Sequence, residues 1–364
     1  MRPVIHQLVH TLSYGDAISG EVIALRRAFH ELGWDSEIYS INTHPHYQGQ
    51  TRDYRDFPQD FSGKVILHLS LGSPLSALYL GLAQAERVMI YHNLTPPEWF
   101  AGVNPRIVRD ITQGLGELPD ICRVSDLIIA DSVFNARELD RYGVQAQVLP
   151  LPVDPARWSE PANSGIKALL AGDPVVHLLH VGRLAPNKCV EDIIKVFYFL
   201  RHHVSAQAKL WLVGIDIDTE VYSFSLKRLA RELEVDDAVQ FVGSLSDSEV
   251  RALYEGASVY MCMSEHEGFC VPLIEAMHFG LPVIAFDSSA VADTVGSGGI
   301  IVREKRHAEI AELVVKVAEP GELREQMKQA GKQRVAELSY YNFKLALKEI
   351  FSADMKSQRL VGQR

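Results

Sequence analysis

The amino-acid sequence predicts an α/β protein with two domains, each built on a parallel sheet. Its 364 residues are too many for one ordinary hydrophobic core. Short apolar runs alternate with helical patterns along two successive blocks of the chain, as is typical of parallel sheets covered by helices on both faces. Residues 148–158 separate the blocks, and their three prolines exclude a helix and favour an extended junction.

The elements of each block follow from the spacing of the apolar residues. In the first block, strands are expected over residues 3–8, 36–41, 64–71, 87–92 and 127–130. In the second block, strands are expected over 175–181, 210–214, 239–243, 259–263 and 282–286, and helices over 190–204, 221–233, 247–255 and 271–279. The tail from His307 is helical, with a break at residues 319–321. The predicted domains are residues 1–155 and 156–338, followed by a C-terminal helix in residues 339–364.

The composition is that of a globular protein, with 47% hydrophobic and 23% charged residues. A formal net charge of −10 argues against a nucleic-acid-binding surface but allows a local anion site. The four cysteines form no CxxC pair, so we expect reduced thiols in a reducing compartment. The N-terminus has no signal-peptide pattern, and no apolar run reaches about 18 residues, so a cytoplasmic protein is expected.

The sharpest motif is residues 267–275, EGFCVPLIE, in which seven residues separate two glutamates. It follows an expected strand and runs into a helix whose first turn accommodates the proline. A phosphate could bind at the positive end of that helix, to the N–H groups of Phe269, Cys270 and Val271. Glu275 could accept hydrogen bonds from both ribose hydroxyls, and Glu267 from sugar hydroxyls. Alternatively, the two glutamates merely interact with the helix dipole.

A second motif, residues 181–188 (VGRLAPNK), joins an expected strand to a helix. Arg183 offers a planar set of donors and Lys188 a point charge, so together they could neutralise a diphosphate. Taken alone, the simpler interpretation is two solvated cations on an ordinary loop. A functional interpretation is favoured when this loop and the two glutamates are considered together.

Two segments of the first block add candidate ligand contacts. Residues 13–20, SYGDAISG, contain Gly15 and Gly20, which permit close backbone approach, and Asp16. A helix expected to begin near residues 19–20 would direct its amides at a ligand, although the segment could be a plain turn. His92 ends an expected strand, where it could act in catalysis or be a satisfied core residue.

Other catalytic and metal-binding patterns receive no support. The sequence holds no GxSxG, P-loop, HExxH or Cys/His ligand cluster. Residues 216–218 have the form D-x-D, but no clustered oxygen ligands accompany them. We therefore expect neither a metal ion nor a resident cofactor.

Together, these segments resemble the retaining glycosyltransferases of family GT4, whose GT-B fold has two Rossmann-like domains facing across a cleft. The match is carried by HVGRLAPNKCVEDIIKVF and FVGSLSDSEVRALYEGASVYMCMSEHEGFCVPLIEAMHFGLPVI in the second block. SYGDAISG, HELGW and YHNLTPPEWF match more loosely in the first. The family often has Gly where this chain has Cys270.

The resemblance implies an N-terminal acceptor-binding domain, a C-terminal nucleotide-sugar-binding domain and a final helix that packs across to the first domain. It implies that Arg183 and Lys188 hold the donor diphosphate, that Glu275 binds the ribose and that Glu267 binds the transferred sugar. It also implies that His92 lies beside the reaction centre. The loop over the phosphates would contain Gly15, Asp16 and Gly20, and the base would lie between Leu245 and Tyr254.

The activity that this resemblance implies is retaining transfer of a hexosyl group from UDP- or GDP-hexose to a sugar or lipid-linked acceptor, in surface polysaccharide or glycoconjugate synthesis. No carboxylate suits a covalent intermediate, so the expected route is the family's front-face displacement without a metal, in which cations stabilise the leaving phosphate. A non-catalytic nucleotide-sugar-binding subunit and a sugar-nucleotide 2-epimerase are the alternatives. Peripheral contact with the inner face of the membrane is also open, and the sequence does not specify base, sugar, acceptor or oligomeric state.

Overall fold

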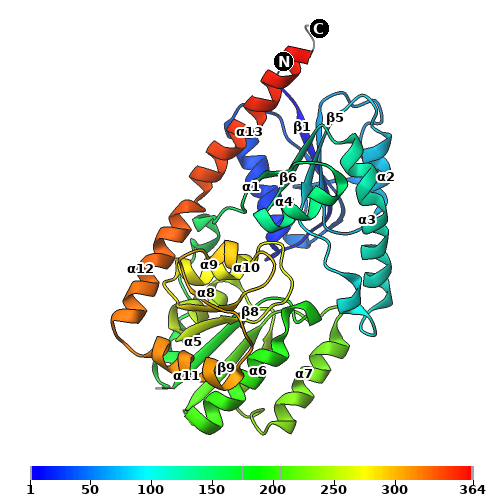
Figure 1. Ribbon diagram of the computed structural model, residues 1–364. Helices are drawn as coiled ribbons and strands as arrows, with labels where there is room; N and C mark the ends of the chain where they lie inside the picture. Colours follow the sequence, from blue (N-terminus) through cyan, green and yellow to red (C-terminus); the bar gives the residue numbers. More distant parts are fainter. Residues whose placement is uncertain (1, 174, 205–206, 362–364) are drawn as a thin grey trace. The chain divides into compact units, whose positions relative to one another are not determined.

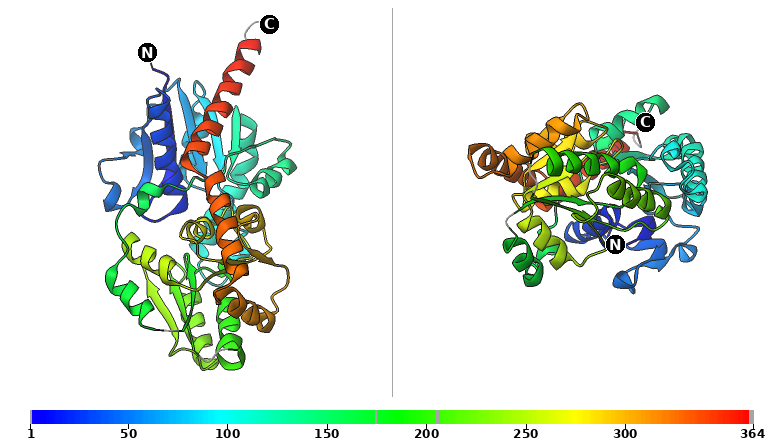
Figure 2. Two further views of the ribbon diagram at one scale, coloured as in Figure 1. Left: turned by 90° about the vertical axis from the view of Figure 1, so that its left-hand side faces the viewer. Right: turned by 90° about the horizontal axis from the view of Figure 1, so that it is seen from below.

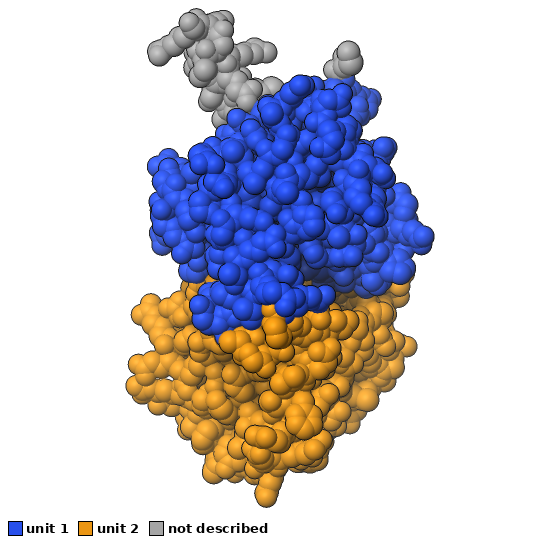
Figure 3. Space-filling model, turned by 90° about the vertical axis from the view of Figure 1, so that its right-hand side faces the viewer, with its two compact units in different colours: residues 1–98, 106–152, 338–364 blue, residues 99–105, 153–337 orange. Residues whose placement is uncertain are grey.

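The computed structural model describes residues 2–173, 175–204 and 207–361, which form two compact units (Figures 1 and 3). The first unit comprises residues 1–98, 106–152 and 338–364, and the second comprises residues 99–105 and 153–337. Each unit has its own parallel sheet and its own hydrophobic core. The predicted class, an α/β protein with two parallel-sheet domains, is confirmed.

The sheet of the first unit has seven strands in the order β3-β2-β1-β4-β5-β6-β7. These strands are β1 (Ile5–Leu12), β2 (Ile38–Thr43), β3 (Arg52–Asp53), β4 (Lys64–Leu69), β5 (Glu86–Tyr91), β6 (Leu127–Ala130) and β7 (Gln147–Val148). The strand order reverses between β1 and β4, and ligands of open α/β sheets bind at the carboxyl ends of strands at such a point. The loop after β1 and the end of β5, where candidate residues were predicted, lie at this edge.

Helices cover both faces of the first sheet. Their bounds are α1 (Ala17–Glu31), α2 (Pro74–Gly81), α3 (Pro105–Val124), α4 (Val133–Leu139) and α13 (Tyr340–Val361). Figures 1 and 2 show α1 and α13 on the same side of the sheet, where they share one core cluster. The ring of Phe351 on α13 packs edge-on against Phe29 of α1 at a centroid distance of 5.4 Å. The C-terminal helix therefore belongs to the core of the first unit.

The sheet of the second unit has six strands in the order β10-β9-β8-β11-β12-β13. These strands are β8 (Val176–Val181), β9 (Ala208–Val213), β10 (Val239–Gly243), β11 (Val259–Cys262), β12 (Val283–Phe286) and β13 (Ile300–Val302). The order reverses between β8 and β11, so the loops that follow these two neighbouring strands are the expected ligand-binding loops. They are the loops that contain the VGRLAPNK and EGFCVPLIE motifs.

Eight α-helices lie in the described part of the second unit. Their bounds are α5 (Ser164–Ala171), α6 (Val190–Phe199), α7 (Glu220–Glu232), α8 (Asp247–Gly256), α9 (Val271–His278), α10 (Val291–Val295), α11 (His307–Ala318) and α12 (Glu322–Glu337). The predicted break at residues 319–321 separates α11 from α12. The single helix expected over 190–204 is wrong in part, because α6 ends at Phe199 and continues as a π-helical turn, Leu200–Val204.

Candidate functional site

The second unit brings Lys188 and Glu267 into direct contact at the carboxyl edge of its sheet. Lys188 ends the turn Pro186–Lys188 after β8, and Glu267 lies in the loop between β11 and α9. The Lys188 Nζ donates to both carboxylate oxygens of Glu267, at 2.7 and 2.6 Å. The Lys188 side chain is 22% exposed and that of Glu267 is 7% exposed. The structure thus brings two predicted site residues together in a contact that the motif spacing did not predict.

Burial opposes charge on both groups, but their mutual attraction outweighs it. Desolvation lowers the pKa of Lys188, yet the Glu267 carboxylate holds it above its usual value. Desolvation raises the pKa of Glu267, yet the Lys188 ammonium holds it below its usual value. Two serines absent from the sequence prediction support the pair: Ser264 Oγ donates to Glu267 Oε1 at 2.8 Å, and Ser289 Oγ accepts from the Glu267 amide at 2.8 Å. The pair is therefore charged at neutral pH.

Glu275 lies on α9 and is bound by two other side chains. The Tyr254 hydroxyl on α8 donates to Oε2 at 2.8 Å, and the Arg157 guanidinium donates to Oε1. Arg157 Nε also donates to Asp247 at 3.0 Å, and its guanidinium lies 4.5 Å from the centre of the Trp158 ring. Glu275 thus holds a cation where the sequence analysis expected ribose hydroxyls.

One partner of Glu275 was not predicted and the other was. Arg157 was missed, because it lies in the proline-rich junction, whose prolines indicated only a linker. Tyr254 was predicted beside the base, and in the structure it is 1% exposed with its hydroxyl on Glu275. Leu245 is half-buried in the loop between β10 and α8. The roles of both residues toward a base stay predictions.

The start of α9 has the predicted location and an unusual backbone. Cys270 is the residue before the helix, with a φ of 75°, and Val271 is the first helical residue. The left-handed region costs a residue with a Cβ about 1 kcal/mol, whereas the glycine common in the family adopts it freely. The hydroxyl of Thr294 donates to the carbonyl of Phe269 at 2.5 Å and holds the preceding turn. First-turn N–H groups have no partner within a helix, so this end suits an anion.

Arg183 and His180 lie on either side of the β8 end. Arg183 Nη2 donates to the carbonyl of Ile217 at 2.7 Å, in the loop between β9 and α7. His180 is buried, and its Nδ1 donates to the carbonyl of Met261 at 3.0 Å. Burial lowers the pKa of His180 to about 4, so the ring is neutral and Nε2 is an acceptor. His180 was missed, because one histidine inside an apolar strand resembles an ordinary core residue.

In the first unit, α1 begins earlier than predicted. Asp16 caps the helix: its Oδ2 accepts from the Ser19 amide at 2.9 Å and from the Ser19 hydroxyl at 2.8 Å. The helix therefore starts at Ala17, and the prediction of a start near residues 19–20 was wrong. Gly20 lies in the first turns of α1 and not in the loop. Gly15 remains in the loop, with a φ of 75°.

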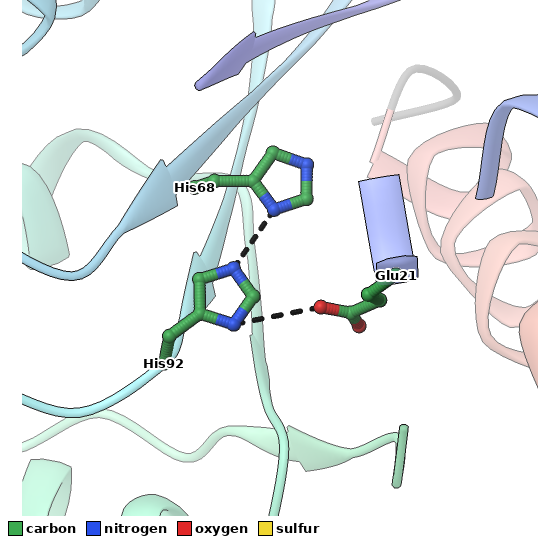
Figure 4. A group of neighbouring side chains, drawn as sticks. All are labelled: Glu21, His68 and His92. Carbon is green, nitrogen blue, oxygen red and sulfur yellow. Dashed lines mark hydrogen bonds and ion pairs between the residues drawn. The ribbon is translucent and has the colours of Figure 1, made fainter. Parts of the chain in front are cut away.

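His92 directly follows β5 and belongs to a buried polar cluster (Figure 4). Its Nδ1 lies 2.9 Å from Asp131 Oδ2 and 3.4 Å from Glu21 Oε2. Its Nε2 lies 2.8 Å from His68 Nδ1, and His68 Nε2 lies 3.0 Å from Gln7 Oε1. Gln7, His68, His92 and Asp131 come from β1, β4, the end of β5 and the end of β6, which are successive strands of the sheet. We call these four residues and Glu21 the His92 cluster.

The hydrogen bonds of the His92 cluster specify its protons. The Gln7 amide oxygen only accepts, so His68 Nε2 carries a proton and His68 Nδ1 accepts. His92 Nε2 must then donate to His68, and its Nδ1 donates to Asp131. His92 is therefore an imidazolium whose two N–H groups are both bound to the protein. The structure places the predicted catalytic His92 in the interior of the unit.

The pKa values agree with this assignment. Burial lowers the pKa of His92, but the charge of Asp131 and its hydrogen bond more than compensate and raise it to about 9. Burial also raises the pKa of Asp131, and the charge of His92 opposes that rise. Burial, together with the charge of Asp131, raises the pKa of Glu21 to about 8, so Glu21 is protonated at neutral pH. The ligand atoms of Glu21, His68 and His92 lie within 4.8 Å of one another. One metal ion does not suit them, since His68 and Glu21 face different nitrogens of the same ring.

Comparison with known proteins gives a family match for the second unit. Residues 167–334 match the family described as Glycosyl transferases group 1. The chain is 36% identical over 112 residues to an uncharacterized glycosyltransferase of Haemophilus influenzae, covering 31% of this chain and 30% of the relative. It is 30% identical over 128 residues to a GDP-mannose:cellobiosyl-diphosphopolyprenol alpha-mannosyltransferase of Komagataeibacter xylinus, covering 34% and 32%. The chain thus spans about a third of the length of these curated relatives.

Solved structures match over both units. The structure of Anabaena Alr3699/HepE in complex with UDP and glucose aligns with a TM-score of 0.74 and 15% identity, covering 97% of this chain and all of that one. The two parallel sheets and this likeness identify the fold as GT-B. Within the described ranges, no helix combines the length and the apolar character needed to cross a bilayer.

Proposed function

Since residues 167–334 match the family Glycosyl transferases group 1, we propose that this chain transfers a hexosyl group from a nucleoside diphosphate sugar to an acceptor hydroxyl. The donor is a UDP- or GDP-hexose, and the acceptor is a sugar or a lipid-linked glycan of surface polysaccharide or glycoconjugate synthesis. Transfer retains the configuration at the anomeric carbon and requires no metal ion. Two names support this donor class: the K. xylinus relative is named for GDP-mannose, and the Anabaena structure is described as a complex with UDP and glucose.

The observation that carries the proposal is the Lys188–Glu267 pair beside the start of α9. As the bond from the anomeric carbon to the diphosphate breaks, negative charge grows on the leaving phosphate. Fixed positive groups aimed at that charge lower the barrier more than they stabilise the bound donor. The Lys188 ammonium and the free N–H groups at Cys270 and Val271 are such groups. Lys188 is partly exposed, so it can reach a phosphate while Glu267 keeps it charged.

The remaining contacts suggest how the donor is held. Glu275 accepts two hydroxyl hydrogen bonds from the ribose once Arg157 leaves it, and Asp247 remains as the partner of that guanidinium. Glu267 turns one carboxylate oxygen to the sugar hydroxyls while the other keeps Lys188. Arg183 contributes the second cation for the diphosphate. In the front-face route, the leaving phosphate oxygen takes the proton of the attacking acceptor hydroxyl, so no protein base is needed.

His92 has a less direct role in this proposal. Its two N–H groups are bound to Asp131 and His68, so the ring cannot donate to a sugar without breaking one of these hydrogen bonds. We assign it to positioning the end of β5, and thereby the residues that follow it at the carboxyl edge of the sheet.

A ligand screen followed by a turnover assay tests the proposal. UDP, GDP, ADP and their hexose conjugates are screened by thermal shift, and a donor present at about 100 times its Kd should stabilise the protein by about 2.7 kcal/mol. The isolated protein is then given the binding donor with EDTA, and release of the nucleoside diphosphate and the anomeric configuration of the product are measured. Binding without any release would favour a non-catalytic subunit, and conversion of the donor sugar to its 2-epimer would favour the epimerase. Neither binding nor turnover would refute the proposal.

A further inference from the structure

Two thiols lie against each other beneath the start of α9. Cys262 ends β11 and Cys270 precedes α9, and their Sγ atoms are 3.9 Å apart. Cys262 is buried at 1% exposure, and Cys270 is half-buried. The other two cysteines, Cys122 on α3 and Cys189 at the start of α6, lie in other elements.

The surroundings of this thiol pair are polar, unlike those of a core cysteine. The Cys262 Sγ lies 3.3 Å from Ser264 Oγ, and a Glu267 carboxylate oxygen lies within 4.8 Å of both sulfurs. The hydrogen bond from Cys270 lowers the pKa of the Cys262 thiol despite its burial. The same hydrogen bond, together with burial, raises the pKa of the Cys270 thiol well above its usual value, so the two thiols titrate as a coupled pair in which Cys270 holds its proton more firmly.

A metal ion fits these groups less well than a covalent bond between the sulfurs. Glu267 is the only oxygen ligand near the two sulfurs among the described metal-ligating groups, and Lys188 already binds both of its oxygens. A cation would have to displace that ammonium or lie beside it. A disulfide leaves the ion pair between Glu267 and Lys188 in place: it brings the two sulfurs from 3.9 Å to about 2.05 Å and removes only the hydrogen bond between the Cys270 thiol and the Glu267 carboxylate.

We propose that Cys262 and Cys270 are an oxidation site, which forms a reversible disulfide by exchange with a low-molecular-weight disulfide such as oxidised glutathione. The Cys270 sulfur, the more exposed of the two, gives its proton to Cys262 as it attacks one glutathione sulfur. The first glutathione leaves as a thiolate and takes that proton from Cys262. The Cys262 thiolate then attacks the Cys270 sulfur, breaks the mixed disulfide and releases the second glutathione. The two protein thiols lose two electrons and two protons, and the oxidised glutathione gains both as two thiols.

The disulfide changes the backbone that follows. Cys270 carries one of the N–H groups at the start of α9 and already has a left-handed φ, so pulling its sulfur toward β11 displaces that N–H. The consequence for activity rests on the proposed function. Oxidation lowers transfer by roughly tenfold or more, because an N–H group that is positioned to stabilise the charge on the leaving phosphate is displaced. Formation of the disulfide itself does not depend on the proposed function.

Peptide mapping tests the site directly. The full chain is incubated with oxidised glutathione, unfolded, alkylated and cleaved after glutamate under non-reducing conditions. Glu265 and Glu267 lie between the two cysteines, so Cys262 and Cys270 fall on separate peptides, residues 256–265 and 268–275. We expect mass spectrometry to find these peptides joined, and separate again after dithiothreitol. The pair should be absent in C262S and in C270S, and present in the control C122S.

The outcomes separate this inference from the proposed function. Glutathione on Cys270 without joined peptides, or no modification at all, would overturn the oxidation site. In the activity arm, oxidised wild-type protein should lose transfer and regain it with dithiothreitol, whereas C270S, which can form neither the mixed disulfide nor the protein disulfide, should lose none of its starting activity in oxidised glutathione. Joined peptides in a protein that shows no transfer under any condition would refute the proposed function and leave the oxidation site standing. An equal fractional loss of transfer in C270S and wild type would overturn the regulatory consequence.

Discussion

Each unit holds a cation beside carboxyl groups, and the two clusters differ in how far they are open to solvent. The His92 cluster lies inside the first unit, where the side chains of His92, Asp131 and Glu21 are 1%, 4% and 0% exposed. In the second unit, the Lys188 ammonium bound to Glu267 belongs to a side chain that is 22% exposed. A partly exposed cation can take a ligand as a further partner, whereas the His92 ring already uses both nitrogens within the protein.

The difference has an energetic basis. A buried charge that loses its partner cannot recover hydration, so breaking such a pair is strongly destabilising. A pair at the edge of the protein loses less, because water or an anion replaces the missing group. We therefore expect changes in the His92 cluster to act on the stability of the first unit, and changes at Lys188 to act on turnover.

The largest expected effect is on turnover, from Lys188→Ala. Loss of one group that stabilises the transition state costs about 100- to 1,000-fold in rate, so kcat/KM for the donor should fall by that factor. Steady-state kinetics with the donor found by the thermal-shift screen measures it. The matched control is Lys195→Ala on α6, which removes a partly exposed ion pair with Asp192 and should leave kcat/KM within about twofold. Equal losses in both variants would mean that Lys188 has no special role.

The next largest effect is on stability, from Asp131→Asn. The substitution keeps the shape of the side chain but removes the charge that holds the His92 imidazolium, so unfolding should become easier by about 2–3 kcal/mol. The protein is unfolded in a series of denaturant concentrations, and proteolytic cleavage within the first unit reports the fraction unfolded. Asp120→Asn, at an exposed site on α3, should change stability by about 0.5 kcal/mol or less. If the two variants unfold alike, the His92 cluster does not contribute to stability.

The smallest effect is a pH dependence that has opposite signs in the two units. In the first unit, the pKa of His92 is raised to about 9, so its stabilisation is complete below about pH 6.5 and is lost as the pH rises through 9. Glu21 acts in the same direction: with a pKa of about 8, it keeps its proton in the folded protein while the unfolded carboxyl ionises above about pH 4.5. In the second unit, the pKa of His180 is about 4, so stability falls as the pH drops from about 6.5 toward 4.

Proteolysis at a series of pH values, with peptides assigned to each unit by mass spectrometry, measures this difference. Glu21→Gln should remove the part of the first unit's loss that falls between about pH 4.5 and 8, because an amide does not titrate, and should leave the acidic loss in the second unit unchanged. A loss of the same size between about pH 4.5 and 8 in E21Q and in the wild type would contradict the raised pKa of Glu21.

The sequence predicted some elements closely and missed others for a physical reason. Strands β6 and β10 have the expected bounds. For β6, the continuous apolar run LIIA identifies a buried parallel strand. The edge strands β3 and β7 have two residues each, and so short a segment cannot show the alternation of apolar and polar residues that identifies a strand. The start of α1 was predicted too late because Gly20 suggested that the loop extends to it, whereas Asp16 caps the helix four residues earlier.

The candidate site was predicted in its loops and missed in its pairings. Lys188 and Glu267 were both expected on loops at the carboxyl edge, yet 79 residues separate them and nothing in either motif specifies that they touch. Arg157 reaches Glu275 across 118 residues, from a segment whose prolines indicated only a junction. His68 and Asp131 joined His92 because three neighbouring strands end beside one another.

The order of residues along the chain was enough to determine the alternating strands and helices, the helix start within EGFCVPLIE, and the two blocks that became two units. Those features depend on apolar spacing and on backbone preference within a few residues. Which carboxylate holds which cation, and whether His92 faces a ligand or the interior, was decided only by tertiary structure. Strand order brings distant residues within hydrogen-bond distance, and the resulting burial sets their charges.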